Sequence, residues 1–130
     1  MSFDACPCSG YTLDRFVRPS VMAVLARNPE GLHGYAITQQ LGEIAIFGAM
    51  PPDATGLYRA LKNMEIEGYL QSTWDVEGSG PARRIYTLTE SGWECLRQWQ
   101  GTLKSYALNL ERTLEFIENS LASNQAAAAT

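Results

Sequence analysis

The chain has 130 residues, of which 45% are hydrophobic, and a formal net charge of −4. This length is typical of one domain with a modest core, and the negative charge argues against indiscriminate binding to nucleic acids. No apolar run reaches the roughly 18–20 residues that span a bilayer, and the start of the sequence lacks a basic segment followed by an apolar one, so we expect a cytoplasmic protein with no membrane partner.

The first segment, residues 1–11, is predicted to be an irregular arm that contains Cys6-Pro7-Cys8. Two thiols at this spacing can hold a soft metal, with Cys95 or His33 as further ligands, or can be oxidised. A closed zinc site needs four ligands, however, and the spacing matches no strong zinc signature, so we predict no metal site and no cofactor. Cys6 and Cys8 are then either structural residues of the arm or the input of a thiol or metal sensor.

The first predicted helix begins near Thr12 and ends before Pro29, because its apolar residues recur at helical spacing. Pro19 lies inside this run, where it either kinks the helix or marks its true first turn. A second, short helix is predicted over residues 33–41. His33, the only histidine of the chain, is expected to orient the start of that helix.

A third helix, predicted over residues 53–67, is the most informative segment. Asp53 is expected to be its N-cap, and Gly68 is expected to end it. Its apolar residues share one face: Leu57, Leu61 and Met64. Hydroxyls and cations gather largely on the other face: Thr55, Tyr58, Arg59 and Lys62. Such a face suits a DNA major groove, although most amphipathic helices are merely solvated on their polar side.

A β-hairpin is predicted next, because two runs rich in β-branched and aromatic residues flank a Gly/Pro/Ser-rich segment, residues 77–82. Arg83 and Arg84 lie where the chain leaves the hairpin tip, and Trp74 is interpreted as packed under the hairpin. Two short helices followed by a hairpin with a basic tip predict a winged helix-turn-helix over residues 12–88. The predicted fold class is therefore mainly α with a small β-hairpin.

A long helix is predicted over residues 89–121, with a capped start at Thr89-Glu90-Ser91-Gly92. Its apolar stripe is too long for so small a domain to cover, which indicates a coiled-coil-like seam with a partner. We therefore predict a homodimer formed through this helix. The predicted interface residues are Leu96, Trp99, Leu103, Ala107, Leu110, Leu114, Ile117 and Leu121. Residues 122–130 are predicted to be a frayed, disordered tail.

Several separate motifs occur in a fixed order along the chain: His33-Gly34-Tyr35, Gly56-Leu57-Tyr58-Arg59-Ala60-Leu61, Glu67-Gly68, Gly80-Pro81 with Arg84 and Tyr86, and Leu88-Thr89-Glu90-Ser91-Gly92. Together they resemble the PadR family of bacterial transcription regulators, over residues 14–118. The run that starts at Asp53-Ala54-Thr55, combined with the amino-terminal cysteines, looks most like the branch of poly-β-hydroxybutyrate-responsive repressors.

The resemblance implies a homodimeric transcription repressor. It would bind double-stranded operator DNA, and a small-molecule effector would release it from the DNA. The predicted DNA contacts are Tyr35, Thr55, Gly56, Tyr58, Arg59, Lys62, Arg83 and Arg84. We expect no enzyme activity, because the sequence contains no Ser/His/Asp order, no Gly-rich phosphate loop and no His-Glu zinc motif. Two alternatives remain open: a thiol or metal sensor that acts through Cys6 and Cys8, and a winged-helix protein-interaction module without DNA binding.

Four aromatic residues form a candidate pocket for an aromatic or apolar effector. Phe47 lies in an apolar linker, residues 43–52, which is either a flap over the core or the wall of a ligand pocket. Trp93, Trp99 and Tyr106 follow at intervals of nearly two turns on the last helix, where core or dimer packing is the simpler interpretation. Some members of the resembling family bind aromatic compounds at the dimer interface.

Overall fold

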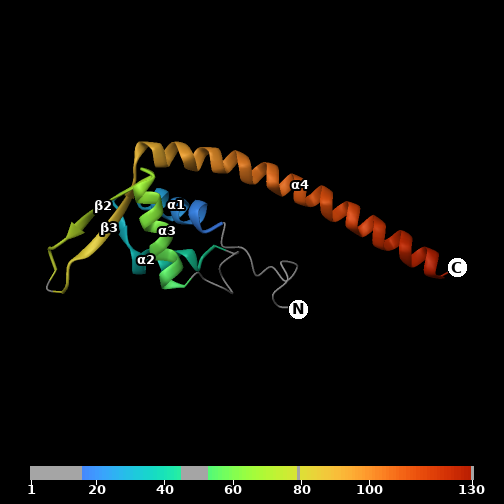
Figure 1. Ribbon diagram of the computed structural model, residues 1–130, viewed down its shortest axis with the longest axis horizontal. Helices are drawn as coiled ribbons and strands as arrows, with labels where there is room; N and C mark the ends of the chain where they lie inside the picture. The colour runs from blue at the N-terminus through green and yellow to red at the C-terminus, as the bar shows by residue number, and fades with distance from the viewer. Residues whose placement is uncertain (1–15, 45–52, 79, 130) are drawn as a thin grey trace. The chain divides into compact units, whose positions relative to one another are not determined.

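The structure is a computed structural model that describes residues 16–44, 53–78 and 80–129 (Figure 1). It divides into two units, one that ends at Leu96 and one that begins at Arg97. The elements in chain order are α1 (Val17–Arg27), β1 (Leu32–His33), α2 (Gly34–Leu41), α3 (Ala54–Ile66), β2 (Leu70–Asp75), β3 (Arg83–Leu88) and α4 (Glu90–Ala129). The first unit therefore contains three short helices, all the strands of the described residues and the start of α4.

The core of the first unit forms where the apolar faces of α1, α2 and α3 meet the sheet. Its fully buried side chains are Val21, Met22, Leu25, Ile37, Leu41, Leu57, Leu61, Met64 and Leu70. The predicted apolar face of α3 is thus confirmed, since all three of its residues belong to this set. Within the described part of the chain, no polar or charged residue is buried, so the core is held by apolar packing.

The helix ends follow local rules that the sequence carries. The carboxylate of Asp53 accepts a 2.6 Å hydrogen bond from the Gly56 N–H, which confirms the predicted N-cap of α3. Gly68 has a φ of +87°, a left-handed conformation that glycine adopts easily, and it ends this helix as predicted. Helix α1 begins at Val17, so Pro19 lies in the first turn and does not kink the helix.

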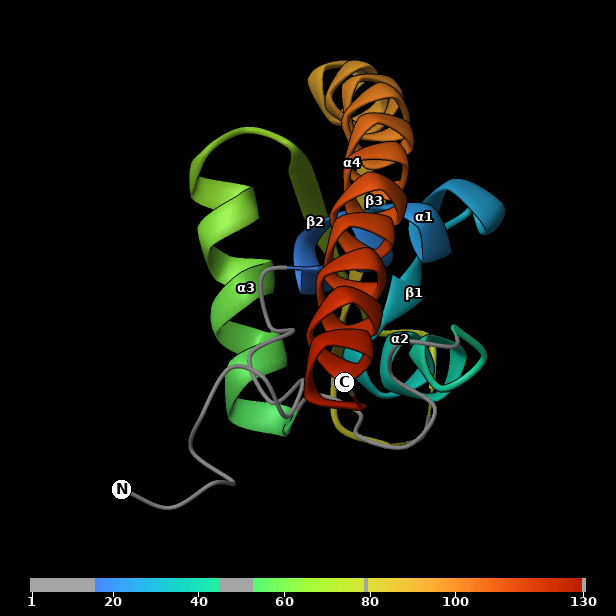
Figure 2. The same cartoon turned by 90° about the vertical axis from the view of Figure 1, so that its right-hand side faces the viewer.

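The sheet has three antiparallel strands in the order β1-β3-β2, one more than the predicted hairpin. Strand β1 pairs Leu32 with Tyr86 and His33 with Ile85, and it leads directly into α2 (Figure 2). His33 is the N-cap residue of α2, but its side chain makes no capping hydrogen bond. His33 therefore stands at the start of α2 with its backbone in the β1–β3 pairing, and its role in orienting the helix stays a prediction.

Helix α4 begins with the predicted cap. The Thr89 hydroxyl accepts a 3.1 Å hydrogen bond from the Gly92 N–H and donates a 2.6 Å hydrogen bond to the Gly68 carbonyl oxygen. The helix continues to Ala129, whereas the sequence predicts a frayed tail from residue 122. Alanine has the highest helix propensity of all residues, which accounts for the longer helix.

Candidate nucleic-acid interface

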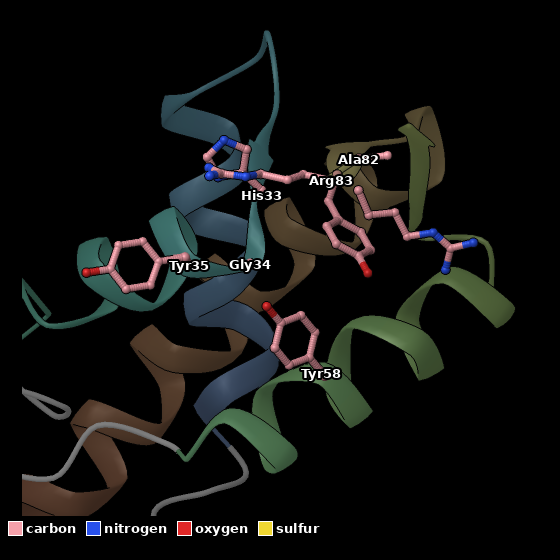
Figure 3. A pocket seen from close by; sticks show the side chains of 8 residues that line it. His33, Gly34, Tyr35, Tyr58, Ala82 and Arg83 are labelled. Atoms are coloured by element: carbon pink, nitrogen blue, oxygen red, sulfur yellow. The ribbon is translucent and has the colours of Figure 1, made fainter. Parts of the chain in front are cut away.

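Four of the eight predicted DNA contacts line a single cleft of about 390 Å³. Tyr35 comes from the first turn of α2, Tyr58 from α3, and Arg83 and Arg84 from the start of β3 (Figure 3). The remaining lining residues are His33, Gly34, Ala82 and Tyr86. Because β1 pairs with β3 and leads into α2, the wing and the start of α2 necessarily lie together. The cleft thus combines two guanidinium groups with three phenols.

The Tyr58 ring lies against the backbone at the start of α2. A Cβ atom placed on Gly34 would lie 2.6 Å from the Tyr58 hydroxyl oxygen and 2.7 Å from its Cε1 atom, which is well inside van der Waals contact. Any side chain at position 34 would therefore displace the ring. Tyr58 is 50% exposed and Tyr35 is 68% exposed, so both can contact a ligand. The Tyr35 hydroxyl also accepts a 3.3 Å hydrogen bond from Gln39 Nε2.

Arg84 is held by two neighbouring side chains. Its guanidinium carbon lies 5.2 Å from the centre of the Trp74 ring, and its Nη1 lies 3.7 Å from Glu65 Oε1. The other Glu65 carboxylate oxygen accepts a hydrogen bond from the Ser72 hydroxyl. Trp74 is 60% exposed, which corrects the interpretation that it packs under the hairpin. Because side chains alternate along a strand, Trp74 lies on the core-facing side of the sheet but beyond the core itself. There the Arg84 guanidinium lies over its ring.

Tyr86 forms the floor of the cleft, because it lines the cleft and is also buried. Burial raises the pKa of Tyr86 above its usual 10.0, while a hydrogen bond and the positive charge of Arg84 act in the opposite direction. The phenol is therefore protonated at neutral pH and is available as a hydrogen-bond donor.

The other four predicted contacts lie on α3 and do not line this cleft. Thr55, Gly56, Arg59 and Lys62 are all exposed, as the amphipathic pattern predicts. The Gly56 N–H is already bonded to the Asp53 carboxylate. Gly56 can therefore offer a ligand only a close approach of its backbone, because its amide is used by the helix cap.

The predicted metal and effector residues are only partly described. Cys6, Cys8 and Phe47 lie outside the described residues. Cys95 is a free, half-buried thiol, and the described ranges contain no group of three or more His, Cys, Asp or Glu side chains that could hold a metal ion. Trp93 and Trp99 are half-buried, whereas Tyr106 is exposed, so the effector pocket stays a prediction.

Helix α4 carries a long apolar stripe that the single chain leaves exposed. All side chains described between residues 100 and 126 are exposed, including Leu103, Leu110, Leu114, Ile117 and Leu121. Leu110 is 67% exposed. An isolated helix in water gains nothing from such a stripe, whereas a partner would bury it.

Comparison with known proteins identifies the family. Residues 21–98 match the Transcriptional regulator PadR-like family. A PadR family transcriptional regulator from Eggerthella lenta DSM 2243 is 28% identical, with a TM-score of 0.66 over 83% of this chain and 92% of that chain. A PadR family transcription regulator from Clostridium difficile R20291 is 22% identical, with a TM-score of 0.65 over 76% of this chain and 98% of that chain.

A third similar structure is that of Bacillus subtilis PadR in complex with operator DNA, which is 22% identical, with a TM-score of 0.56 over 73% of this chain and 59% of that chain. Comparison with curated proteins found no match. In the part of the chain that the structure describes, no helix is long and apolar enough to cross a membrane. The family match covers more than half of the chain and the fold is the predicted winged helix, so this protein belongs to the PadR-like family of transcriptional regulators.

Proposed function

We propose that this protein is a homodimeric transcription repressor that binds operator DNA through α3, the start of α2 and the β2–β3 wing. The observation that carries the proposal is the convergence of Tyr35, Tyr58, Arg83 and Arg84 in one cleft. Guanidinium and phenol groups are donors that suit phosphate oxygens, and arginine binds them with a planar fork of N–H groups. The operator complex of Bacillus subtilis PadR supports this assignment.

In this proposal, the exposed face of α3 recognises the base sequence of the operator. Arg59 lies within the first two turns of α3, where a recognition helix usually meets base edges, and Thr55 lies one turn before it. Tyr58 and Lys62 hold phosphates, and the two wing arginines contact the backbone or the minor groove. A surface of this kind tolerates the net charge of −4, because only the local charge faces DNA.

The apolar stripe of α4 is the proposed dimer interface. Two copies would bury the exposed leucines and Ile117 against each other. The dimer would then present two winged-helix DNA-binding units to a pseudo-palindromic operator. An aromatic or apolar effector would bind beside Trp93, Trp99, Tyr106 or Phe47. Its binding would change the spacing of the two DNA-binding units and so release the DNA.

The proposal is tested by selecting DNA ligands from a random duplex pool with the purified full-length protein. Binding of the enriched duplex is then measured by fluorescence anisotropy at several salt concentrations. Replacing Arg83 and Arg84 with alanine should weaken specific and non-specific binding alike and should lower the salt slope by about one for each phosphate that the variant no longer binds.

The matched control is Arg112→Ala, which removes an exposed arginine of α4 that lies outside the apolar stripe. This variant should bind as tightly as the parent. Failure of the pool to yield any enriched sequence would refute the proposed function. An unchanged salt slope in the Arg83, Arg84 variant would remove the wing from the interface.

Sequence reading is tested separately with Arg59→Ala. Loss of a bidentate contact to guanine should cost roughly 1–3 kcal/mol at the selected operator and relax the preference at one base pair of each half-site. Repeating the selection with this variant measures that preference. An identical base preference in parent and variant would make Arg59 a backbone contact or a structural residue.

A further inference from the structure

We infer that Glu65 and Trp74 are positioning residues that hold the Arg84 guanidinium ready for a DNA phosphate. This inference rests on the proposed function, and it assigns roles to two residues that the family motifs leave out. Neither residue lines the cleft, whereas Arg84, which both contact, does.

The geometry places two different groups beside Arg84. Trp74 lies directly opposite Arg84 in the pairing of β2 with β3, and the guanidinium carbon lies 5.2 Å from its ring centre. This distance is within the range of a cation–π contact. Glu65 projects from α3, and its Oε1 lies 3.7 Å from Arg84 Nη1. Strand and helix together therefore restrict the guanidinium.

Glu65 is itself held in place. The Ser72 hydroxyl donates a hydrogen bond to Glu65 Oε2, so the two carboxylate oxygens have different partners. The Glu65 side chain is 28% exposed, whereas that of Arg84 is 46% exposed. The carboxylate is thus the more fixed member of the pair, and the arginine is the member that still faces solvent.

Restraint of this kind favours binding to phosphate. An unrestrained arginine has many rotamers and loses that freedom when it contacts DNA, whereas a restrained one has lost it already. The guanidinium carries five N–H donors, and its contacts with Glu65, through Nη1, and with the Tyr86 phenol engage only some of them. The remaining donors are available to a phosphate in the cleft.

The expected sign of the Glu65 effect is unusual. Removing a carboxylate near bound DNA normally tightens binding, because the carboxylate repels phosphates. If Glu65 positions Arg84, Glu65→Gln should instead weaken operator binding about two- to fivefold, the range of a partly exposed ion pair. Trp74→Ala should weaken binding by a similar factor, and Trp74→Phe should restore part of it because an aromatic face remains.

The experiment is a double-mutant cycle on the full-length protein and its selected operator, read by fluorescence anisotropy at one salt concentration. Glu65→Gln should weaken the parent but not the Arg84→Ala variant, since no guanidinium remains to be positioned. The matched control is Glu77→Gln, which removes an exposed carboxylate of the same hairpin and should leave binding unchanged or tighter. Circular dichroism melting of each variant checks that the fold is retained.

A second measurement needs no DNA. The order of the Arg84 Nε–H group, measured by nitrogen-15 NMR relaxation in the free protein, should fall in both Glu65→Gln and Trp74→Ala. Tighter or unchanged operator binding by Glu65→Gln, or an unchanged Arg84 order in both variants, overturns the inference while leaving the proposed function intact. A parent protein that binds no duplex overturns both.

Discussion

Replacing Gly92 with alanine should destabilise the first unit sharply, although alanine is the better helix former. Gly92 lies in the first turn of α4, and a Cβ atom there would lie 2.2 Å from the Tyr69 carbonyl oxygen and 3.0 Å from Leu88 Cδ2. The first distance is more than 1 Å shorter than the 3.4 Å at which ordinary contact begins. A carbonyl oxygen in the backbone cannot turn away as a flexible side chain can.

The size of the effect follows from what must move. The Tyr69 carbonyl accepts a 3.1 Å hydrogen bond from the Thr89 N–H, and the Gly92 N–H donates a 3.1 Å hydrogen bond to the Thr89 hydroxyl. Overpacking costs about 1–3 kcal/mol, and removal of a cap costs about 1 kcal/mol. The higher helix propensity of alanine offsets at most about 1 kcal/mol. We therefore expect a net loss of about 1–3 kcal/mol.

The assay is urea unfolding followed by circular dichroism at one fixed protein concentration, because association would make the midpoint depend on concentration. Gly101→Ala is the control within the same helix, since no atom lies within 4 Å of its Cβ position. The control should gain up to about 1 kcal/mol from helix propensity. A Gly92→Ala protein as stable as the parent would refute the close contact between α4 and the Tyr69 carbonyl.

Three further results are expected. Replacing Leu103 and Leu110 with lysine places charges in the apolar stripe at a cost on the order of a few kcal/mol, so light scattering should detect monomers; a folded, dimeric double variant would locate the interface elsewhere. Gly34→Ala should change the unfolding free energy by no more than about 0.5 kcal/mol, because the Tyr58 ring that it displaces is half exposed. The same variant should nevertheless weaken operator binding, and unchanged affinity would exclude Tyr58 from the DNA contacts. The raised pKa of Tyr86 means that folding favours the neutral phenol; its contribution to stability is complete below its usual pKa of 10.0 and is lost as the pH rises through the folded-state pKa. Unfolding by urea above pH 10 should therefore show a smaller decline in stability for Tyr86→Phe than for the parent, and an equal decline in both would show that Tyr86 is not involved.

The sequence alone predicts those features that depend on neighbours along the chain. The cap at Asp53 joins residues three positions apart, and the apolar face of α3 repeats every three or four residues, so both are visible in one short window. The Thr89 cap is visible for the same reason. Such local rules, combined with the family motifs, are enough for the helices, the wing and the winged-helix fold.

Features that depend on distant pairs could not be predicted in this way. Strand β1 has only two residues, too few for any alternating pattern. The pairing of Trp74 with Arg84 depends on the register across the wing, which the loop between the two strands does not reveal. The fit of the Tyr58 ring on Gly34 joins positions 24 residues apart, and only the packed fold brings them together.

The hydroxyl of Thr89 joins the end of one helix to the beginning of another. It donates to the Gly68 carbonyl, just beyond α3, while it accepts from Gly92 in the first turn of α4. A rotation of that first turn must therefore either break one of these two bonds or pull the last turn of α3 along with it. In mechanical terms, Thr89 couples the two helices through its hydroxyl, and a motion imposed on the start of α4 can reach the end of α3 at this junction, outside the core.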